Sequence, residues 1–478
     1  MRLTPFVIGR VLVLPLAGQR PTFAAPANSM SPSPRPRFLR LLLGSAALFF
    51  VSSGASSLAV TLRFDFGSSP AAPGFTLVQP DDLYTSERGF GFEPGATVTA
   101  LDRLPGDRAE NDFVTNAGGF YFSVDLPEGN HRVTITLGDA HAAATTTVKA
   151  ELRRLLLENV TTKPGEFQRL SLVVNVRRHQ IMETREVAAG EVQLKAPRET
   201  TQEAWAWDRR LTLEFNGPRP AVAALEIEPV DVPTLFLLGD STVCDQSREP
   251  YNSWGQMLTR WFKPTVALAN HGESGETYRD SLRRRRLDKI LSVMRPGDTL
   301  LMQFGHNDQK QVAAGTGGPF TTYKDEIKTH VDSVRRHGGI PVIVTPMERR
   351  EFDSHGKIVP SLTDYAEASR QAARELGTAL VDLHAMSIVL YEALGVERSK
   401  AAFAEPEPGK LDPTHHSSFG SYELAKCVAA AIQRSDLAIA QHLVDGFAFD
   451  PAQPDNPAAF NVPPSPLFTN QRPLGDDR

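Results

Sequence analysis

The sequence predicts two domains, an all-β sandwich followed by an α/β domain built in three layers on a five-stranded parallel sheet. From Val60 to about Glu228, short alternating apolar and polar runs are separated by Gly, Pro, Asn and Asp, which is typical of antiparallel strands. After residues 229–233 (PVDVP), apolar runs alternate with amphipathic stretches, which indicates parallel strands covered by helices. A hydrophobic content of 41% and a charged content of 22% are typical of a globular chain with a core.

These patterns place the sandwich at 60–229 and the α/β domain at 234–445. The sandwich strands are expected at 61–66, 119–126, 131–138, 171–177 and 211–217. The parallel strands are expected at 234–239, 265–270, 298–305, 340–346 and 379–385. The helices are expected at 254–263, 279–294, 322–338, 362–377 and 421–435. The tail, 446–478, is rich in Pro, Asn and Asp and is expected to be an extended strap or mobile.

The first 59 residues have the pattern of a secretory signal peptide. Three arginines at positions 35, 37 and 40 precede the apolar run Leu41–Val51, and small residues follow it. The run is too short to span a bilayer comfortably, although an uncleaved anchor stays an alternative. Met30 is an alternative start. We expect a secreted protein, extracellular or periplasmic, without stable membrane insertion once the signal is removed.

The charge of the remaining chain argues against a nucleic-acid partner. The whole chain carries −5 and the first 59 residues carry six arginines and no acidic residue, so the remainder carries −11. The two cysteines, Cys244 and Cys427, are too few for a disulfide framework or a metal cluster. A single bridge and two buried thiols both stay open. No cofactor or metal is expected.

Ser241 lies in the stretch LFLLGDSTVCD (235–245), directly after an expected buried strand. Ser241 is expected to open a helix, so its N–H lies at the positive end of that helix and suits a nucleophile whose product is an oxyanion. The alternative is a helix N-cap. The stretch is not a G-x-S-x-G motif.

Other candidate groups also follow expected strands or precede a helix. Asp412 and His415 lie in DPTHH, at a spacing that lets the carboxylate orient an imidazole base. Asn307, in GHND, can donate to an oxyanion, and Gly275, in NHGESGE, can present a backbone N–H. The alternatives are a structural loop histidine, an Asx-turn and an ordinary loop. Ligands of open α/β sheets bind at the carboxyl ends of the strands, where most of these residues fall.

Taken in this order, the four blocks resemble the SGNH (GDSL) hydrolases, and further segments resemble the rhamnogalacturonan acetylesterase branch. These segments are 239–245 (GDSTVCD), 251–258 (YNSWGQML), 303–310 (QFGHNDQK), 345–353 (TPMERREFD), 380–387 (LVDLHAMS) and 412–421 (DPTHHSSFGS). Residues 64–95 and 120–139 resemble the galactose-binding-like domain that precedes such enzymes. The resemblance implies a flavodoxin-like catalytic domain after a jelly-roll sandwich.

The resemblance also implies a role for each site residue. Ser241 would be the nucleophile and would give one oxyanion N–H, Gly275 would give the second, and Asn307 would donate from its side chain. His415 would be the general base, and Asp412 would orient it. One departure is that Glu276 stands where the family has an arginine, which alters the charge beside the site.

Several neighbouring residues are expected to have supporting roles. Asp240 is expected to hydrogen-bond within its turn, His416 to pack, and residues 283–286 to form a solvated helix face. His306 is expected either to be structural or to line the site. Candidate substrate contacts are Arg279, Arg349 and Arg350, of which the last two suit a carboxylated sugar, and the aromatic residues Tyr251, Trp254 and Tyr323, of which Trp254 suits the core better.

The expected activity is removal of O-acetyl groups from a plant cell-wall type polysaccharide by a secreted carboxylic ester hydrolase. The expected partner is an acetylated polysaccharide or oligosaccharide, and the sequence does not determine the oligomeric state. One alternative is a broad esterase or lipase acting on small or lipid esters. Another is a carbohydrate-binding protein whose hydrolase domain is inactive.

Overall fold

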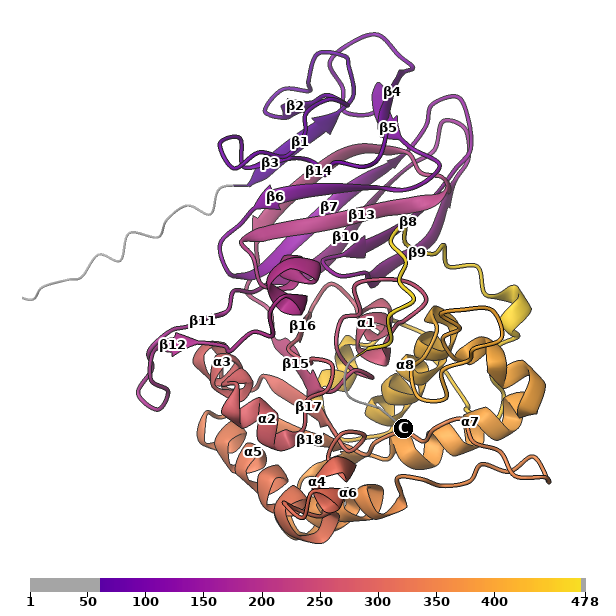
Figure 1. Cartoon of the computed structure of the whole chain (residues 1–478). Helices are drawn as coiled ribbons and strands as arrows, with labels where there is room; N and C mark the ends of the chain where they lie inside the picture. Colours follow the sequence, from indigo (N-terminus) through magenta and orange to yellow (C-terminus); the bar gives the residue numbers. More distant parts are fainter. Residues whose placement is uncertain (1–60, 474–478) are drawn as a thin grey trace, which may run out of the picture. The chain divides into compact units, whose positions relative to one another are not determined.

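The computed structural model describes residues 61–473, so the expected signal segment 1–59 lies outside the described residues. Within these residues, fourteen strands, β1–β14, precede an α/β region that begins at β15 (Figure 1). Two of them, β11 (Gln180–Ile181) and β12 (Gly190–Glu191), form a separate two-stranded sheet. Among the described residues, no helix is both long and apolar enough to cross a membrane.

The strand-rich domain consists of two sheets whose strands are mostly antiparallel. One sheet has the order β10-β7-β14-β1-β2, with β4 and β5 attached, and the other has the order β3-β6-β13-β8-β9. Phenylalanines from β1, β3 and β6 form its centre, with Phe66 and Phe122 in an edge contact at 5.0 Å. The strands are β1 (Leu62–Phe66), β2 (Thr76–Val78), β3 (Phe90–Phe92), β4 (Thr99–Asp102), β5 (Asp112–Thr115), β6 (Phe120–Asp125), β7 (Gly129–Gly138), β8 (Ala144–Ala150), β9 (Arg154–Thr162), β10 (Phe167–Val176), β13 (Arg210–Arg219) and β14 (Val222–Pro229).

The second domain is built on a parallel sheet with the order β16-β15-β17-β18-β19. This is the doubly wound order in which the chain starts near the middle and extends toward both edges. The strands are β15 (Thr234–Gly239), β16 (Ala267–Asn270), β17 (Thr299–Gln303), β18 (Ile340–Val344) and β19 (Ala379–Val381). Each lies within a predicted strand. The predicted fold class, a β-sandwich followed by a three-layer α/β domain on five parallel strands, is confirmed.

Alternate residues of β15 face opposite layers, which explains why its sequence is apolar throughout. Leu235 and Leu237 belong to a core with α1, α7 and α8, whereas Phe236 and Leu238 belong to a core with α3, α5 and α6. The helices are α1 (Trp254–Leu258), α2 (Tyr278–Arg283), α3 (Arg286–Val293), α4 (Gln309–Ala313), α5 (Lys324–Arg336), α6 (Thr363–Leu376), α7 (Leu383–Arg398) and α8 (Ser418–Gln433).

Three local predictions about helices are wrong. No helix begins at Ser241; the chain turns there, and α1 begins at Trp254 behind a capping box formed by Ser253 and Gln256. The single helix expected at 279–294 is two helices, because Arg285 has a φ of +61°. Helix α7 was not predicted, since its apolar start at Leu383 continues the pattern of β19.

The C-terminal segment 446–473 is an extended strap, drawn in yellow beside β8 and β9 in Figure 1. Lys149 of β8 donates to the Pro463 carbonyl at 2.8 Å, and Asn216 of β13 donates to the Pro464 carbonyl at 2.7 Å. The strap then pairs with Glu249 of the α/β domain, which donates to the Leu467 carbonyl at 2.8 Å. It therefore touches both domains.

Candidate active site

Four loops of the α/β domain contribute the candidate site. The first three follow β15, β16 and β17, whose carboxyl ends lie at one edge of the sheet, and they carry Ser241, Gly275 and Asn307. The fourth precedes α8 and carries Asp412 and His415. Residues from distant parts of the sequence thus meet at the sheet edge where open α/β folds bind ligands.

Ser241, His415 and Asp412 form one chain of hydrogen bonds. His415 Nε2 lies 2.9 Å from Ser241 Oγ, and His415 Nδ1 lies 2.9 Å from Asp412 Oδ2. Asp412 Oδ1 also accepts the backbone N–H groups of Thr414 and His415 at 2.9 and 3.0 Å. This is the arrangement in which an imidazole takes a serine proton while a carboxylate fixes the imidazole tautomer.

The environment of Asp412 keeps its carboxyl group ionised. The side chain is 2% exposed, and burial by itself opposes the charged form. The hydrogen bond and charge of His415, with the two backbone N–H groups, outweigh burial and hold the pKa of Asp412 far below its ordinary value. A permanently charged carboxylate is what an imidazolium formed during a reaction requires.

The turn around Ser241 is held by Asp240 rather than by a helix. The Asp240 carboxylate accepts from the Thr242 N–H at 3.0 Å and from the Thr242 hydroxyl at 2.7 Å, and its carbonyl accepts from the Val243 N–H at 3.0 Å. The prediction that Asp240 serves its turn is confirmed. The prediction that Ser241 begins a helix is wrong, so a helix dipole cannot be the source of positive potential at its N–H.

Asn307 and Gly275 have the geometry of groups that face an anion. Asn307 Nδ2 donates one hydrogen to the Glu276 carbonyl at 3.1 Å, which fixes the amide and leaves its second N–H available. Gly275 has a φ of +74°, a left-handed conformation that a side chain would disfavour. The family-based expectation that both serve an oxyanion is compatible with this backbone.

The charge of Glu276 is neutralised inside the protein and is not presented to the site. Its carboxylate is fully buried, 2.8 Å from Lys195, 3.3 Å from Arg284 and 3.6 Å from Arg286. Arg286 is itself buried and pairs with Glu199 at 2.6 Å. The expectation that residues 283–286 form a solvated helix face is therefore wrong for Arg286, because its guanidinium is buried between Glu199 and Glu276. These ion pairs join the α/β domain to the segment before β13.

Arg349 and Arg350 support the loop of Asp412 and His415. Arg349 is 1% exposed, and its Nε donates to Thr414 Oγ1 at 3.2 Å. The Arg350 N–H donates to the Pro413 carbonyl at 2.7 Å, and its guanidinium contacts Ser399 Oγ at 3.0 Å. The Arg349 guanidinium thus holds the loop that carries Asp412 and His415, and its expected contact with a carboxylated sugar stays a prediction.

The remaining candidate contacts divide into core residues and residues near the site. Arg279 pairs with Glu326 of α5 at 2.8 Å and donates to the Thr316 carbonyl at 3.1 Å. Trp254 and Tyr323 are buried, and their polar atoms bond to Gln303 and to the Phe304 carbonyl, so neither forms a sugar platform.

Tyr251, His306 and His416 all lie close to His415 or its neighbours. The Tyr251 ring meets the His415 ring edge-on at 5.9 Å. His306 Nδ1 lies 3.3 Å from Asp240, while its buried Nε2 has no hydrogen-bond partner among residues 61–473. His416 bonds to Tyr391 at 2.7 Å and packs as expected; burial lowers its pKa to about 3.

The sequence did not indicate one further residue that touches the triad, Arg472. Its guanidinium donates to both oxygens of Asp412, at 2.7 and 3.0 Å. The contact joins residues 60 positions apart, and no local pattern marks it.

The two cysteines, Cys244 and Cys427, are both free and buried, so the disulfide bridge left open by the sequence is absent.

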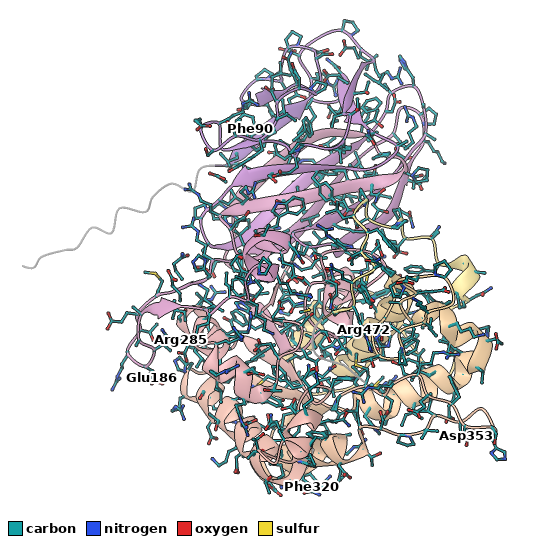
Figure 2. All side chains as sticks on the ribbon, viewed as in Figure 1. Phe90, Glu186, Arg285, Phe320, Asp353 and Arg472 are labelled. Atoms are coloured by element: carbon teal, nitrogen blue, oxygen red, sulfur yellow. The ribbon has the colours of Figure 1, made fainter. Side chains whose placement is uncertain are left out.

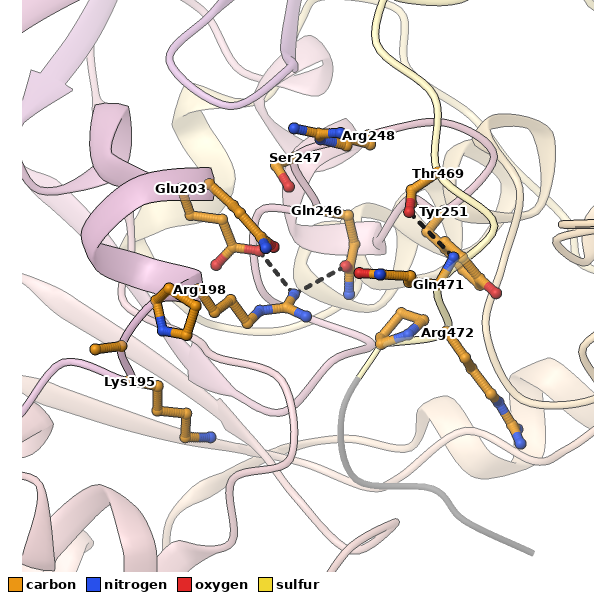
Figure 3. Close-up of a pocket in the computed structure, with 14 residues that line it drawn as sticks. Lys195, Arg198, Glu203, Gln246, Ser247, Arg248, Tyr251, Thr469, Gln471 and Arg472 are labelled. Atoms are coloured by element: carbon orange, nitrogen blue, oxygen red, sulfur yellow. Dashed lines mark hydrogen bonds and ion pairs between the residues drawn. The ribbon is translucent and has the colours of Figure 1, made fainter.

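A hollow of about 260 Å³ lies beside Tyr251 and Arg472, the two residues that contact His415 and Asp412 (Figure 3). Tyr251 and Arg472 line it, and so contact both the hollow and the triad. The other walls come from the segment before β13, the loop after β15 and the strap, with Arg198, Arg248 and Gln471 among them. The buried Tyr251 hydroxyl has no hydrogen-bond partner there.

The fold and the Ser–His–Asp geometry define a serine ester hydrolase of the SGNH type. Comparison with known proteins agrees, because the GDSL-like Lipase/Acylhydrolase family matches residues 237–407. The Beta-agarase/YXIM esterase-like, galactose-binding domain-like family matches residues 62–186. The matched hydrolase region ends before Asp412, so that residue rests on the geometry above.

Three proteins of Bacillus subtilis (strain 168) are similar to the chain. Rhamnogalacturonan acetylesterase RhgT is 38% identical over 227 residues, covering 45% of this chain and 95% of the relative. Probable rhamnogalacturonan acetylesterase YesY is 31% identical over 214 residues, covering 44% and 97%. The uncharacterized esterase YxiM is 27% identical over 389 residues, covering 79% and 91%. The chain therefore belongs to the GDSL-like lipase/acylhydrolase family, with a galactose-binding-like domain ahead of the hydrolase domain.

Proposed function

We propose that the protein removes O-acetyl groups from an acetylated, rhamnogalacturonan-like polysaccharide outside the cytoplasm. The 2.9 Å contact between Ser241 Oγ and His415 Nε2, completed by Asp412, carries the proposal of ester hydrolysis. The polysaccharide part is supported by the 38% identity to a rhamnogalacturonan acetylesterase. Export is supported by the basic, apolar and small-residue order of residues 1–59.

In the first half of the reaction, Ser241 Oγ attacks the acetyl carbonyl and His415 Nε2 takes its proton. The carbonyl oxygen becomes an oxyanion, which the N–H groups of Ser241 and Gly275 and the free N–H of Asn307 stabilise. Collapse of this intermediate breaks the bond to the sugar oxygen. His415 then returns its proton to that oxygen, so the sugar leaves as an alcohol and an acetyl-serine remains.

In the second half, water attacks the acetyl-serine and His415 takes a proton from the water. The same donors stabilise the second oxyanion. Acetate leaves, Ser241 Oγ recovers its proton from His415, and the enzyme is regenerated. Asp412 orients the imidazole in both halves and stays ionised, as its surroundings favour.

The test compares substrates for the purified protein and for Ser241→Ala, which serves as the control for background hydrolysis. Acetate release is measured on acetylated pectin fractions, on acetylated xylan and on long-chain fatty acyl esters. We expect the highest kcat/KM on the rhamnogalacturonan-rich pectin fraction. A preference for long-chain esters would instead support the broad esterase alternative. Activity of Ser241→Ala close to that of the wild type would refute the mechanism itself.

A further inference from the structure

The C-terminal strap delivers Arg472 to the triad carboxylate. Arg472 Nε donates to Asp412 Oδ2 at 2.7 Å and Nη2 donates to Oδ1 at 3.0 Å, which is a two-pronged arginine–carboxylate contact. With the bonds from His415 and Thr414, each carboxylate oxygen accepts at least two donors. Figure 2 shows Arg472 in the middle of the view, away from the peripheral Phe320 and Asp353.

The position of Arg472 depends on anchors upstream in the strap. Ser465 is 5% exposed, and its hydroxyl bonds to Glu214 of β13 at 2.8 Å and to Lys149 of β8 at 2.8 Å. The Ser465 N–H donates to Glu249 at 3.0 Å. The strand-rich domain thus holds the strap seven residues before the arginine reaches the hydrolase site.

Glu249 fixes the direction of the strap between Ser465 and Arg472. Its N–H donates to the Leu467 carbonyl at 2.8 Å, and its own carbonyl accepts from the Thr469 N–H at 2.7 Å. The Glu249 carboxylate also pairs with Arg153, which donates to the Tyr251 carbonyl at 2.7 Å. Backbone pairing therefore leads the chain along the loop that carries Tyr251 and toward Asp412.

A cation on Asp412 changes how the triad responds to protons. The carboxylate attracts a proton to the neighbouring imidazole, and a guanidinium on both carboxylate oxygens offsets part of that attraction. Arginine stays charged throughout the working pH range, so this offset is permanent. Because Asp412 is 2% exposed and Arg472 is 34% exposed, water screens the pair only from the arginine side.

We propose that Arg472 is a positioning residue of the reaction, which fixes the Asp412 carboxylate and extends esterase activity to lower pH. The proposal rests on the proposed function, since it assumes that His415 is the base. The strand-rich domain then supports catalysis indirectly, because it anchors the strap that carries this arginine.

Other titratable and charged groups also face the pair, and they are unchanged by a substitution at position 472. Among the described residues, Tyr251 from the loop after β15 and His416 from the same loop as His415 interact with Asp412. Nearby charged groups are His306, which pairs with Asp240 at the ends of β17 and β15, and Arg349 from the loop after β18, which donates to Thr414. The effect of Arg472 is therefore measured as a difference between variants.

The test measures the pH dependence of kcat/KM for a small acetyl ester in the wild type, Arg472→Gln and Arg472→Lys. In Arg472→Gln the acid limb of the profile is expected to move to higher pH, by on the order of one unit. Arg472→Lys keeps the charge and should retain the wild-type limb, with a lower kcat because one prong is lost. A limb that is unmoved in Arg472→Gln, or that moves to lower pH, overturns the proposal.

Arg370→Gln is a matched control for the loss of a two-pronged pair. Arg370 binds both oxygens of Asp382 at 2.9 Å through Nε and Nη2, the same two atoms that Arg472 uses, and Asp382 is the N-cap residue of α7. Its removal should lower Tm about as much as Arg472→Gln and should leave the acid limb in place. A shift of the limb in both variants would assign the effect to general destabilisation and overturn the proposal. Failure of the proposed mechanism would be seen in a different variant, because it would appear as near-normal activity of Ser241→Ala.

Discussion

Two carboxylate–histidine pairs in the α/β domain have the same contact distance and different surroundings. In one, Asp412 Oδ2 lies 2.9 Å from His415 Nδ1; in the other, Glu348 Oε1 lies 2.9 Å from His384 Nε2. Both histidines are at most 5% exposed. The second nitrogen of His415 meets the Ser241 hydroxyl, whereas the second nitrogen of His384 meets the Arg370 guanidinium at 3.3 Å.

An acid–histidine contact does not by itself make a catalytic pair, because the group at the other imidazole nitrogen differs between the two histidines. Both ring nitrogens of His384 contact side chains of the surrounding fold, Arg370 at Nδ1 and Glu348 at Nε2. Glu348 in turn accepts the backbone N–H groups of Ser361 and Leu362. His415 instead has a hydroxyl on its free side, at the carboxyl edge of the parallel sheet. The group at the second imidazole nitrogen therefore decides what an acid–histidine pair can do. A hydroxyl there can give up a proton, whereas a guanidinium only ties two segments of the chain together.

Removal of the Ser241 hydroxyl should have the largest effect, because it is the feature that distinguishes the His415 pair from the His384 pair. Ser241→Ala should lower kcat by about 10⁴- to 10⁶-fold, because neither imidazole then has a nucleophile to activate. Hydrolysis of a small acetyl ester measures the loss, and circular dichroism checks the fold. Near-normal turnover in this variant would mean that another group is the nucleophile and that the two pairs are not distinguished by Ser241.

Substituting the carboxylate of the first pair gives the next largest effect. Asp412→Asn should lower kcat by about 10⁴-fold, because an amide no longer holds the tautomer that accepts the serine proton. The expected change in Tm is small compared with the change in rate, since the backbone N–H groups of Thr414 and His415 still find an acceptor. If kcat stays within tenfold of the wild type, Asp412 is not the orienting acid.

Substituting the carboxylate of the second pair should act on stability instead. Burial raises the pKa of Glu348, but the hydrogen bonds from His384, Ser361 and Leu362 outweigh burial and lower the pKa to about 2. A depressed folded-state pKa adds stability that is fully present above the ordinary value of 4.5 and is lost as pH falls toward 2. Glu348→Gln should therefore lower Tm by several degrees at pH 7 while kcat stays close to the wild type.

Thermal unfolding at several pH values tests whether the stability contributed by Glu348 is lost as the pH falls. The difference in Tm between the wild type and Glu348→Gln should shrink as the pH falls below about 4.5, since the wild-type carboxylate then loses its advantage. A difference that grows toward acid pH would contradict the assigned direction. A large fall in kcat at pH 7 would show that the second pair also takes part in catalysis.

Much of the fold was accessible from the sequence because its signals are local. The strands of the parallel sheet are apolar on both faces, and the helices between them have a clear amphipathic period. The helix expected at Ser241 was wrong because Asp240 binds the Thr242 N–H and closes a turn instead. Helix α7 was missed because its first turn has the composition of a strand end.

Short patterns of residue types are enough to predict the layered architecture and the family, and they also single out Ser241, Asp412 and His415 as candidates. The pairing of charges, in contrast, becomes visible only in the folded chain. Glu276 is neutralised by Lys195 and Arg286, and Arg472 reaches Asp412 from 60 residues away. These pairings depend on distances in space, which a chain of residue types does not specify, and burial then makes each pairing obligatory because an isolated charge inside a protein is strongly destabilising.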